Sequence, residues 1–223
     1  MAVAVLALTA CGKYKIVPVD APAPANATAA LSLPAAANAA FPAPAPTQQM
    51  IHFVNSPANA QSPGLQSHFI NFAFDYPADW SVTPSTGTPT ATSFVALQQT
   101  TGGRLVSTID VGVSPDVSMA DVFASAEQEL SQAPGYQQAY LRKTTFGGLP
   151  GGELGFSTTS TDPQTGQPLT RYGRLIIVPN NVRITGPALQ VLMDSADPNV
   201  RSPADVGASG ELAQIVTSFR LAY

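Results

Sequence analysis

Residues 68–80 read HFINFAFDYPADW, and this stretch decides the fold of the chain. From His68 to Phe74 apolar residues recur with a period of two, which is the pattern of a strand that buries one face. The following residues, Tyr76 to Trp80, are expected to turn out of the strand, because Pro77 has no N–H to donate to a ladder. The stretch therefore predicts that a half-buried strand opens the folded domain.

Apolar runs separated by turn residues fill the rest of the chain. Further strands are expected at 93–99, 105–113, 137–145, 152–161, 171–178 and 182–185. The turns between them are expected at Gly102-Gly103, 147–151, 162–168 and Asn180-Asn181. An insertion at 187–203 is expected to precede a last helix over 203–217, and Ser218–Tyr223 closes the chain.

One helix within this run of strands is expected to begin after Ser118. Its hydroxyl can cap the helix, and Asp121 at the third helical position resembles the acidic member of a capping box. The apolar positions that recur at three and four are Val122, Phe123, Ala126 and Leu130. We expect this helix to bury one face and to stop near Pro134-Gly135. The pattern as a whole predicts an α+β fold, a twisted and mostly antiparallel sheet flanked by helices.

The segment upstream, 11–65, is expected to be an Ala/Pro-rich disordered tether, followed by a globular domain over 66–223. Proline removes backbone donors and favours extended chain, and no periodic apolar face is present. The cluster MIHFV at 50–54 breaks this pattern, and it is either a strand or a docking segment.

The N-terminus carries an apolar run, Ala2–Ala10, that is too short to span a bilayer but fits the core of a signal peptide. It ends in Leu8-Thr9-Ala10-Cys11, which resembles the lipobox of bacterial lipoproteins. The resemblance implies a signal peptide over 1–10, acyl chains such as palmitate on Cys11, and a membrane anchor. Gly12 would then permit transfer to the outer membrane of a two-membrane cell.

One feature of a signal peptide is missing, and one alternative interpretation exists. No Lys or Arg precedes the apolar run, so either the true start lies upstream of Met1 or export is inefficient. The alternative is a short buried apolar segment with a core cysteine. The lipid anchor explains the single cysteine better, because the Pro-rich sequence that follows cannot build a core around that segment.

Three short motifs resemble the PsbP/Mog1-like superfamily, with its LpqN-like lipoproteins. They are Phe74-Asp75-Tyr76-Pro77-x-x-Trp80, the stretch Gly148–Glu153, and Ile215-Val216-x-Ser218-Phe219. The resemblance implies an α/β/α sandwich. It also implies a protein that binds other proteins rather than catalyses, as in photosystem II extrinsic subunits, nuclear-transport GTPase cofactors and envelope lipoproteins.

Composition excludes several classes of function. The net charge is -4, and two of the three lysines, Lys13 and Lys15, stand beside Cys11, so phosphate-based nucleic-acid binding is not expected. One cysteine permits neither an internal disulfide nor a thiolate metal cage.

The side chains capable of catalysis or ligand binding are few. His68 is expected to be a solvated strand-end residue, and Asp194 and Asp197 to lie in a structural loop. The glycines at 147–152 indicate a hairpin turn rather than a phosphate cradle, because a strand and not a helix follows them. Tyr76 and Trp80 are expected to cap the core, the alternative being binding-surface anchors.

We therefore expect no catalytic residues, no cofactor and no metal, and one lipidated residue, Cys11. The expected protein is a membrane-anchored envelope lipoprotein that acts as a non-catalytic protein-binding or assembly module. Its expected partners are a membrane, reached through Cys11, and an envelope protein. The alternative is an envelope hydrolase or small-ligand-binding lipoprotein with a site that the sequence hides.

Overall fold

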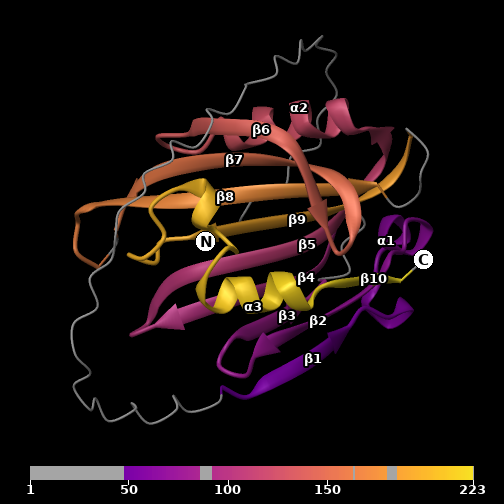
Figure 1. Ribbon diagram of the computed structural model, residues 1–223, viewed down its shortest axis with the longest axis horizontal. Coiled ribbons are helices and arrows are strands. Elements are labelled where there is room, and N and C mark those ends of the chain that lie inside the picture. Colours follow the sequence, from indigo (N-terminus) through magenta and orange to yellow (C-terminus); the bar gives the residue numbers. More distant parts are fainter. Residues whose placement is uncertain (1–47, 86–91, 163, 180–184, 223) are drawn as a thin grey trace, which may run out of the picture.

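The computed structural model describes residues 48–85, 92–162, 164–179 and 185–222, which form two antiparallel sheets (Figure 1). The larger sheet has the strand order β3-β4-β5-β9-β8-β7-β6. Its strands are β3 (Ser81–Pro84), β4 (Ser93–Thr101), β5 (Arg104–Ser118), β6 (Gln137–Phe146), β7 (Leu149–Thr161), β8 (Pro168–Pro179) and β9 (Thr185–Ser195). The smaller sheet has the order β1-β2-β10 and consists of β1 (Met50–Val54), β2 (Asn71–Pro77) and β10 (Arg220–Ala222).

Helices lie on both faces of the seven-stranded sheet. α2 (Met119–Leu130) packs on one face, where Leu175 and Ile177 of β8 meet it. α3 (Gly210–Ser218) and the three-stranded sheet cover the other face and enclose the larger core, which Ile176 enters (Figure 1). The remaining helices are α1 (Pro63–Ser67) and the short 3-10 helices η1 (Pro57–Asn59) and η2 (Pro203–Asp205). This arrangement confirms the predicted α+β fold, a mostly antiparallel sheet flanked by helices.

Phe72 and Phe74 of β2 form the centre of the larger core. Both rings stack on Phe219, at centroid distances of 5.4 and 5.5 Å, and Phe53 of β1 stacks on Phe74 at 5.0 Å. The period of two therefore buries one face, as predicted. The bounds were wrong, because the strand runs over 71–77 rather than 68–74. Pro77 is the last residue of the strand and also the first of the turn, because the Trp80 N–H donates to the Pro77 carbonyl oxygen at 3.1 Å, and a strand end tolerates a missing N–H.

The cap of α2 is the one that the sequence predicts. The Ser118 hydroxyl accepts a hydrogen bond from the Asp121 N–H at 3.2 Å and donates to the Asp121 carboxylate at 2.6 Å. Val122 and Phe123 are buried, while the helix ends at Leu130, four residues before the predicted proline stop. Ser131 is the C-cap, so the chain leaves the helix before it reaches the proline.

The predicted insertion at 187–203 is wrong in its first half, which belongs to β9. This strand lies between β5 and β8, and it pairs with both along most of its length. Leu189, Val191 and Met193 face the larger core, whereas Ala188 and Leu192 face α2. Because both faces are covered, the strand shows no alternation of apolar and polar residues. Most of the strand predicted at 182–185 lies outside the described residues.

The last predicted helix, over 203–217, is two separate helices. η2 and α3 are joined by a turn over 206–209, and Gly207 and Gly210 have φ of +71° and +67°. A right-handed helix cannot continue through such residues, so the single predicted helix is interrupted. The closing segment contains β10, which pairs with the start of β2.

The folded domain begins earlier than the predicted boundary at residue 66. β1 pairs with β2 along five residue pairs, and Asn55, Ala60 and Leu65 are buried. The prolines of this segment do not prevent order, because Pro57 and Pro63 occupy first helical positions, where no N–H is needed. The rest of the predicted tether and the predicted signal peptide with Cys11 lie outside the described residues. Among the residues that the structure describes, none of the helices is long and apolar enough to cross a membrane.

Candidate functional site

Each of the two histidines has bonding partners close by in the described part of the chain. His68 ends α1 rather than the first strand, and its Nδ1 lies 2.9 Å from the Ser67 hydroxyl and 3.0 Å from the Gly64 carbonyl oxygen. His52, which was placed in the tether, lies on β1 with its Nδ1 2.6 Å from the Asp75 carboxylate. Ser218 is near this pair, but its hydroxyl donates to backbone carbonyls and accepts from the Asp75 N–H.

The loop predicted for Asp194 and Asp197 is wrong for Asp194, which lies in β9, and the two carboxylates have separate partners. The Asp194 carboxylate accepts hydrogen bonds from Arg171 Nε at 2.6 Å and from the Thr108 hydroxyl at 2.7 Å, so an ion pair across the sheet uses it. Asp197 lies in the loop after β9 and accepts from the Asn199 N–H at 2.7 Å. Within the described ranges no group of three or more His, Cys, Asp or Glu residues could hold a metal ion.

The glycines at 147–152 form a hairpin, as predicted, but a shorter one. Phe146 pairs directly with Leu149, so the turn consists of Gly147 and Gly148, whose φ angles are +57° and +84°. Gly152 lies within β7 and serves packing, since a Cβ there would lie 2.7 Å from the Phe123 ring of α2.

Trp80 and Tyr76 are core residues, as favoured by the sequence. Trp80 is buried, and its indole N–H donates to Glu211 Oε2 at 2.7 Å. Tyr76 is partly buried and packs edge-on against Phe74 at a centroid distance of 6.2 Å. The indole therefore connects the core to the first residues of α3.

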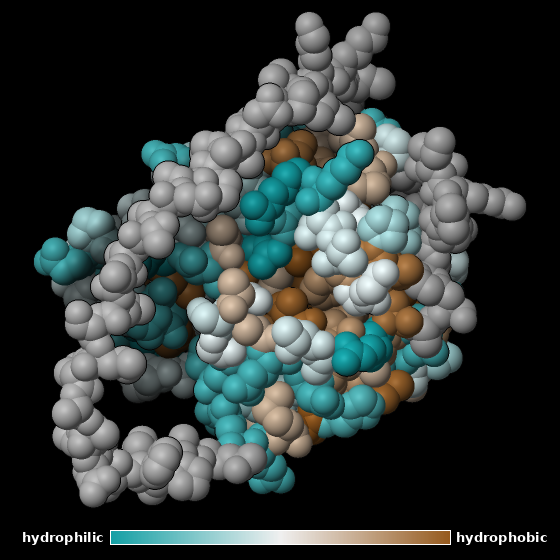
Figure 2. Space-filling view, in the orientation of Figure 1, coloured by the Kyte–Doolittle hydropathy of each residue, from teal (hydrophilic) through white to brown (hydrophobic). Residues whose placement is uncertain are grey.

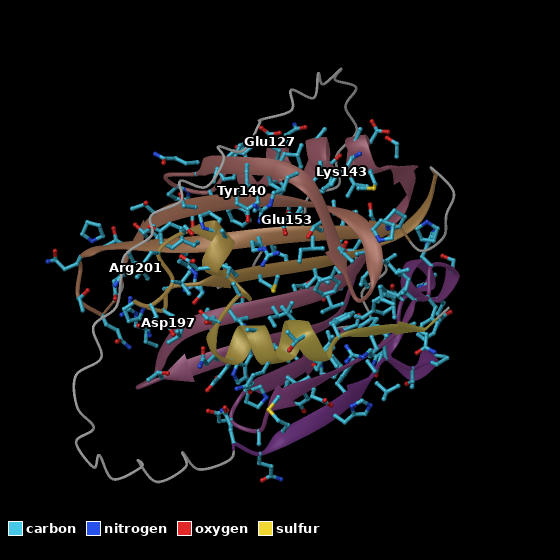
Figure 3. The ribbon with its side chains drawn as sticks, viewed as in Figure 1. Glu127, Tyr140, Lys143, Glu153, Asp197 and Arg201 are labelled. Atoms are coloured by element: carbon cyan, nitrogen blue, oxygen red, sulfur yellow. The ribbon has the colours of Figure 1, made fainter. Side chains whose placement is uncertain are left out.

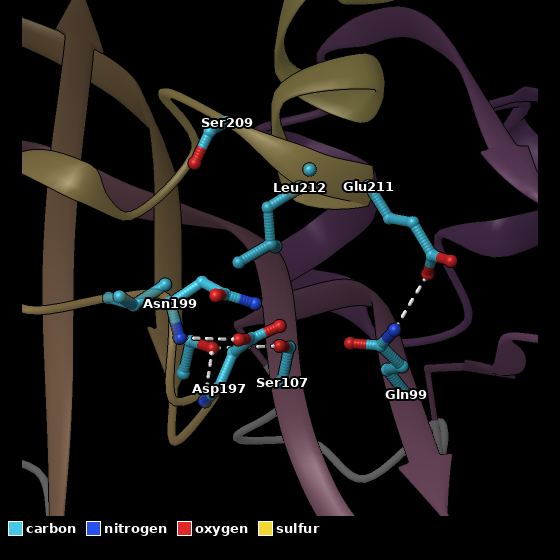
Figure 4. A pocket seen from close by; sticks show the side chains of 10 residues that line it. Gln99, Ser107, Asp197, Asn199, Ser209, Glu211 and Leu212 are labelled. Carbon is cyan, nitrogen blue, oxygen red and sulfur yellow. Dashed lines mark hydrogen bonds between the residues drawn. The ribbon is translucent and has the colours of Figure 1, made fainter. Parts of the chain in front are cut away.

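A pocket of about 420 Å³ lies beside the start of α3 (Figure 4). β4, β5, β9, the loop after β9 and α3 contribute its walls. Its lining residues are Gln99, Ser107, Ser195, Asp197, Asn199, Val200, Ser209, Gly210, Glu211 and Leu212. Only Asp197 among them stands out in the sequence, because the others come together from distant segments.

Most polar groups of the pocket already bond to one another. The buried hydroxyls of Ser107 and Ser195 lie 2.9 Å apart, and Ser195 also accepts from the Asp197 N–H at 3.1 Å. Glu211 accepts from Trp80, from Gln99 at 2.7 Å and from Gln48 at 2.9 Å. The carboxylate is thus held by neutral donors. The arrangement can accept hydrogen bonds from a small ligand, but no histidine lines it to activate a serine.

A second cluster of charge lies on β6, β7 and β8, on the face that η2 partly covers (Figure 3). Glu153 of β7 is 0% exposed and receives two guanidinium groups. Arg142 Nε lies 2.5 Å from its Oε1, and Arg174 bonds its Oε2. Arg174 also donates to the Val206 carbonyl oxygen at 2.7 Å, which ties the cluster to the end of η2.

Tyr140 completes this cluster. Its ring lies against Gly155, where a Cβ would approach the ring to 2.3 Å, and the Arg142 guanidinium stacks 4.3 Å from the ring centroid. Burial raises the pKa of the Tyr140 hydroxyl, and the negative charge of Glu153 raises it further. In the sequence, Glu153 stands out only as part of the motif Gly148–Glu153. The sequence does contain one signal of a buried ion pair at this position. Glu153 is a single carboxylate residue within a predicted strand of glycines and apolar residues.

The charges in this cluster favour the ionised forms. Burial would raise the pKa of the Glu153 carboxyl, but the hydrogen bonds and charges of Arg174 and Arg142 hold that pKa below its ordinary value. The hydrogen bond to Glu153 raises the pKa of Arg142 in turn. Glu153, Arg142 and Arg174 therefore form an ion network in which the charged forms are favoured.

No protein-family model matches the sequence, and no curated protein matches it. The structure is similar to LpqN, described as involved in cell envelope biogenesis of Mycobacterium tuberculosis, with a TM-score of 0.47 and 18% identity over 78% of this chain and 92% of that one. It is also similar to the cyanobacterial PsbP (CyanoP) of Synechocystis, with a TM-score of 0.50 and 10% identity over 82% of this chain and 98% of that one. The second similarity shows a PsbP-like fold, which the sequence motifs predicted.

Proposed function

We propose that the chain is a lipoprotein of the cell envelope, anchored through Cys11, that acts as a non-catalytic protein-binding or assembly module. The location rests on the run Ala2–Ala10 and the lipobox-like end Leu8-Thr9-Ala10-Cys11. Two or three acyl chains hold a protein stably at a membrane, where one chain would not. The chain between the cysteine and β1 would then set how far the domain reaches.

The observation that carries the binding function is the exposed apolar surface of β1. Met50, Ile51 and Val54 are 37%, 38% and 52% exposed, and they are three of the five large apolar residues with high exposure in the described part of the chain. β1 is also an edge strand of its sheet, because among the strands that the structure describes it pairs with β2 alone. Exposed apolar side chains along an open strand edge favour contact with another protein. Figure 2 shows apolar side chains among hydrophilic ones along this margin.

The pocket beside α3 favours a second candidate, a small-ligand-binding lipoprotein. Its volume of about 420 Å³ lies within the range of ligand sites. We prefer the protein-binding function, because Glu211 and the serine pair already have their hydrogen bonds inside the protein. A ligand would have to replace these bonds to gain affinity.

Photo-crosslinking in the native envelope tests the proposal. A photoreactive residue at Val54 is expected to capture a protein, whereas the same residue at Gln98, an exposed polar position on β4, is the matched control. In parallel, the change Cys11→Ala should abolish acyl-chain labelling and release the protein from the membrane fraction. Equal capture at both positions, or unchanged labelling, would contradict the respective half of the proposal.

A further inference from the structure

The outer edge of β6 is a second open strand edge, and it belongs to the seven-stranded sheet, whereas β1 belongs to the three-stranded one. β6 pairs with β7 on one side, and among the described residues no strand pairs with its other side (Figure 1). Its ten residues extend over about 34 Å, and seven of the ten are exposed. An edge of this length can receive several main-chain hydrogen bonds from another strand.

The hairpin register shows which backbone groups are available. The two-residue turn makes Phe146 and Leu149 the hydrogen-bonded closing pair, and bonded and non-bonded pairs then alternate along the ladder. Pro150, which has no N–H, accordingly falls opposite Thr145 in a non-bonded pair. The N–H and C=O groups of Leu141, Lys143 and Thr145 therefore point away from β7.

Two adjacent cations give this edge its charge. The Arg142 side chain is 55% exposed, although its Nε is bonded to Glu153, so part of the guanidinium remains accessible to a partner. Lys143 is exposed and has no ion pair within the described residues. It points to the face of the sheet opposite to that of Arg142, since successive side chains of a strand alternate. Leu141, 42% exposed, lies on the same face as Lys143.

We propose that this edge, defined as the outward backbone of Leu141, Lys143 and Thr145 with the side chains of Arg142 and Lys143, receives an extended segment of a partner protein that carries two adjacent acidic residues. Adjacent side chains of a strand point to opposite faces, so one carboxylate meets each cation. Pairing with a second copy of the chain is disfavoured, because it would bring four cations to one seam. The inference rests on the proposed protein-binding function and adds the site and the kind of segment bound.

The test is photo-crosslinking from Leu141 in the native envelope, with the Val54 capture as internal reference. Lys143→Pro removes one outward N–H without touching the β6–β7 ladder, and it should reduce the Leu141 adduct by about tenfold or more while leaving the Val54 adduct unchanged. Lys143→Glu, which keeps the backbone, should reduce the adduct as well. Mass spectrometry should map the captured segment to a stretch with adjacent Asp or Glu.

The outcomes separate the two proposals. An adduct at Val54 with none at Leu141, or a Leu141 adduct that resists both changes, would overturn the strand-addition proposal and leave the binding function standing. A captured segment without acidic residues would overturn the assigned charge complementarity. If the protein without the Lys143 changes gives an adduct neither at Val54 nor at Leu141, both proposals are overturned. Because Lys143→Glu does not alter the backbone, it decides the matter if the proline variant does not fold.

Discussion

The buried carboxylate of Glu153 on β7 is bonded to the guanidinium of Arg174 on the neighbouring strand β8. The contact is diagonal, because Glu153 lies directly opposite Ile176, two residues after Arg174. Both side chains are almost fully removed from solvent. We expect Glu153→Gln to lower the free energy of unfolding by about 3 kcal/mol or more, because it leaves Arg174 buried without its partner. Urea denaturation at neutral pH measures this. Glu129→Gln, an exposed control on α2, should change stability by less than about 0.5 kcal/mol.

The same pair predicts a pH dependence. The folded-state pKa of Glu153 lies below its ordinary value, so its stabilisation is present above the unfolded-state pKa of about 4.3 and is lost as pH falls through the folded pKa. The stability difference between the unmodified protein and Glu153→Gln should therefore shrink in acid. A difference that stayed constant down to the acid transition would contradict this assignment.

Asp110 should behave in the opposite way. Burial raises its pKa, although the Ser93 hydroxyl, which donates to it at 2.9 Å, lowers it in part. The folded state therefore holds the proton more strongly than the unfolded state, and stability falls as pH rises from about 4 through the folded pKa. Asp110→Asn keeps an acceptor for Ser93 and should raise the melting temperature at pH 7 but not at pH 3. A lower melting temperature at pH 7 would refute the burial argument.

Gly155 provides a steric prediction. A Cβ at this position would lie 2.3 Å from the Tyr140 ring, so Gly155→Ala must displace the ring and the Arg142 guanidinium stacked on it. The expected loss is about 1–3 kcal/mol. Gly64→Ala is the matched control, because a Cβ there has only an ordinary contact at 3.9 Å and the position is helical. Equal effects of the two changes would argue against the tight packing of Tyr140.

The position of β1 predicts where the chain can be shortened. A chain that starts at residue 48 should keep the melting temperature of the full chain, whereas one that starts at residue 66 should lose cooperative unfolding. The second truncation removes Phe53 from its stack on Phe74 and also removes the buried Leu65. Thermal unfolding followed by circular dichroism distinguishes the two chains, and equal transitions would mean that β1 adds nothing to the fold.

The sequence predicted those elements whose signals are local. The alternation at Ile70, Phe72 and Phe74, the cap formed by Ser118 and Asp121, and the two diglycine hairpins each depend on neighbouring residues. β9 was missed because both of its faces are buried, which removes the period of two. β1 is the strand that the sequence offered as one of two alternatives for MIHFV at 50–54. It was still included in the tether because prolines surround it, although two of those prolines begin helices.

The candidate sites were less predictable than the fold. Glu153 is 11 residues from Arg142 and 21 from Arg174, and only the sheet register brings the three together. The pocket likewise joins Gln99, Ser107, Ser195 and Glu211 from four separate elements. Cys11 was predicted from a local motif alone and lies outside the described residues, so its lipidation stays a prediction.

The central claim is that this domain binds another protein through the exposed edge strand β1. The most direct measurement is the affinity of the protein captured at Val54 for the purified chain and for its Met50→Ser/Val54→Ser double variant, by isothermal titration calorimetry, since these two exposed side chains lie on the same face of β1. We predict that the double variant keeps its melting temperature and binds at least about tenfold more weakly, because the apolar contact is lost. An unchanged affinity in a folded double variant would contradict the claim.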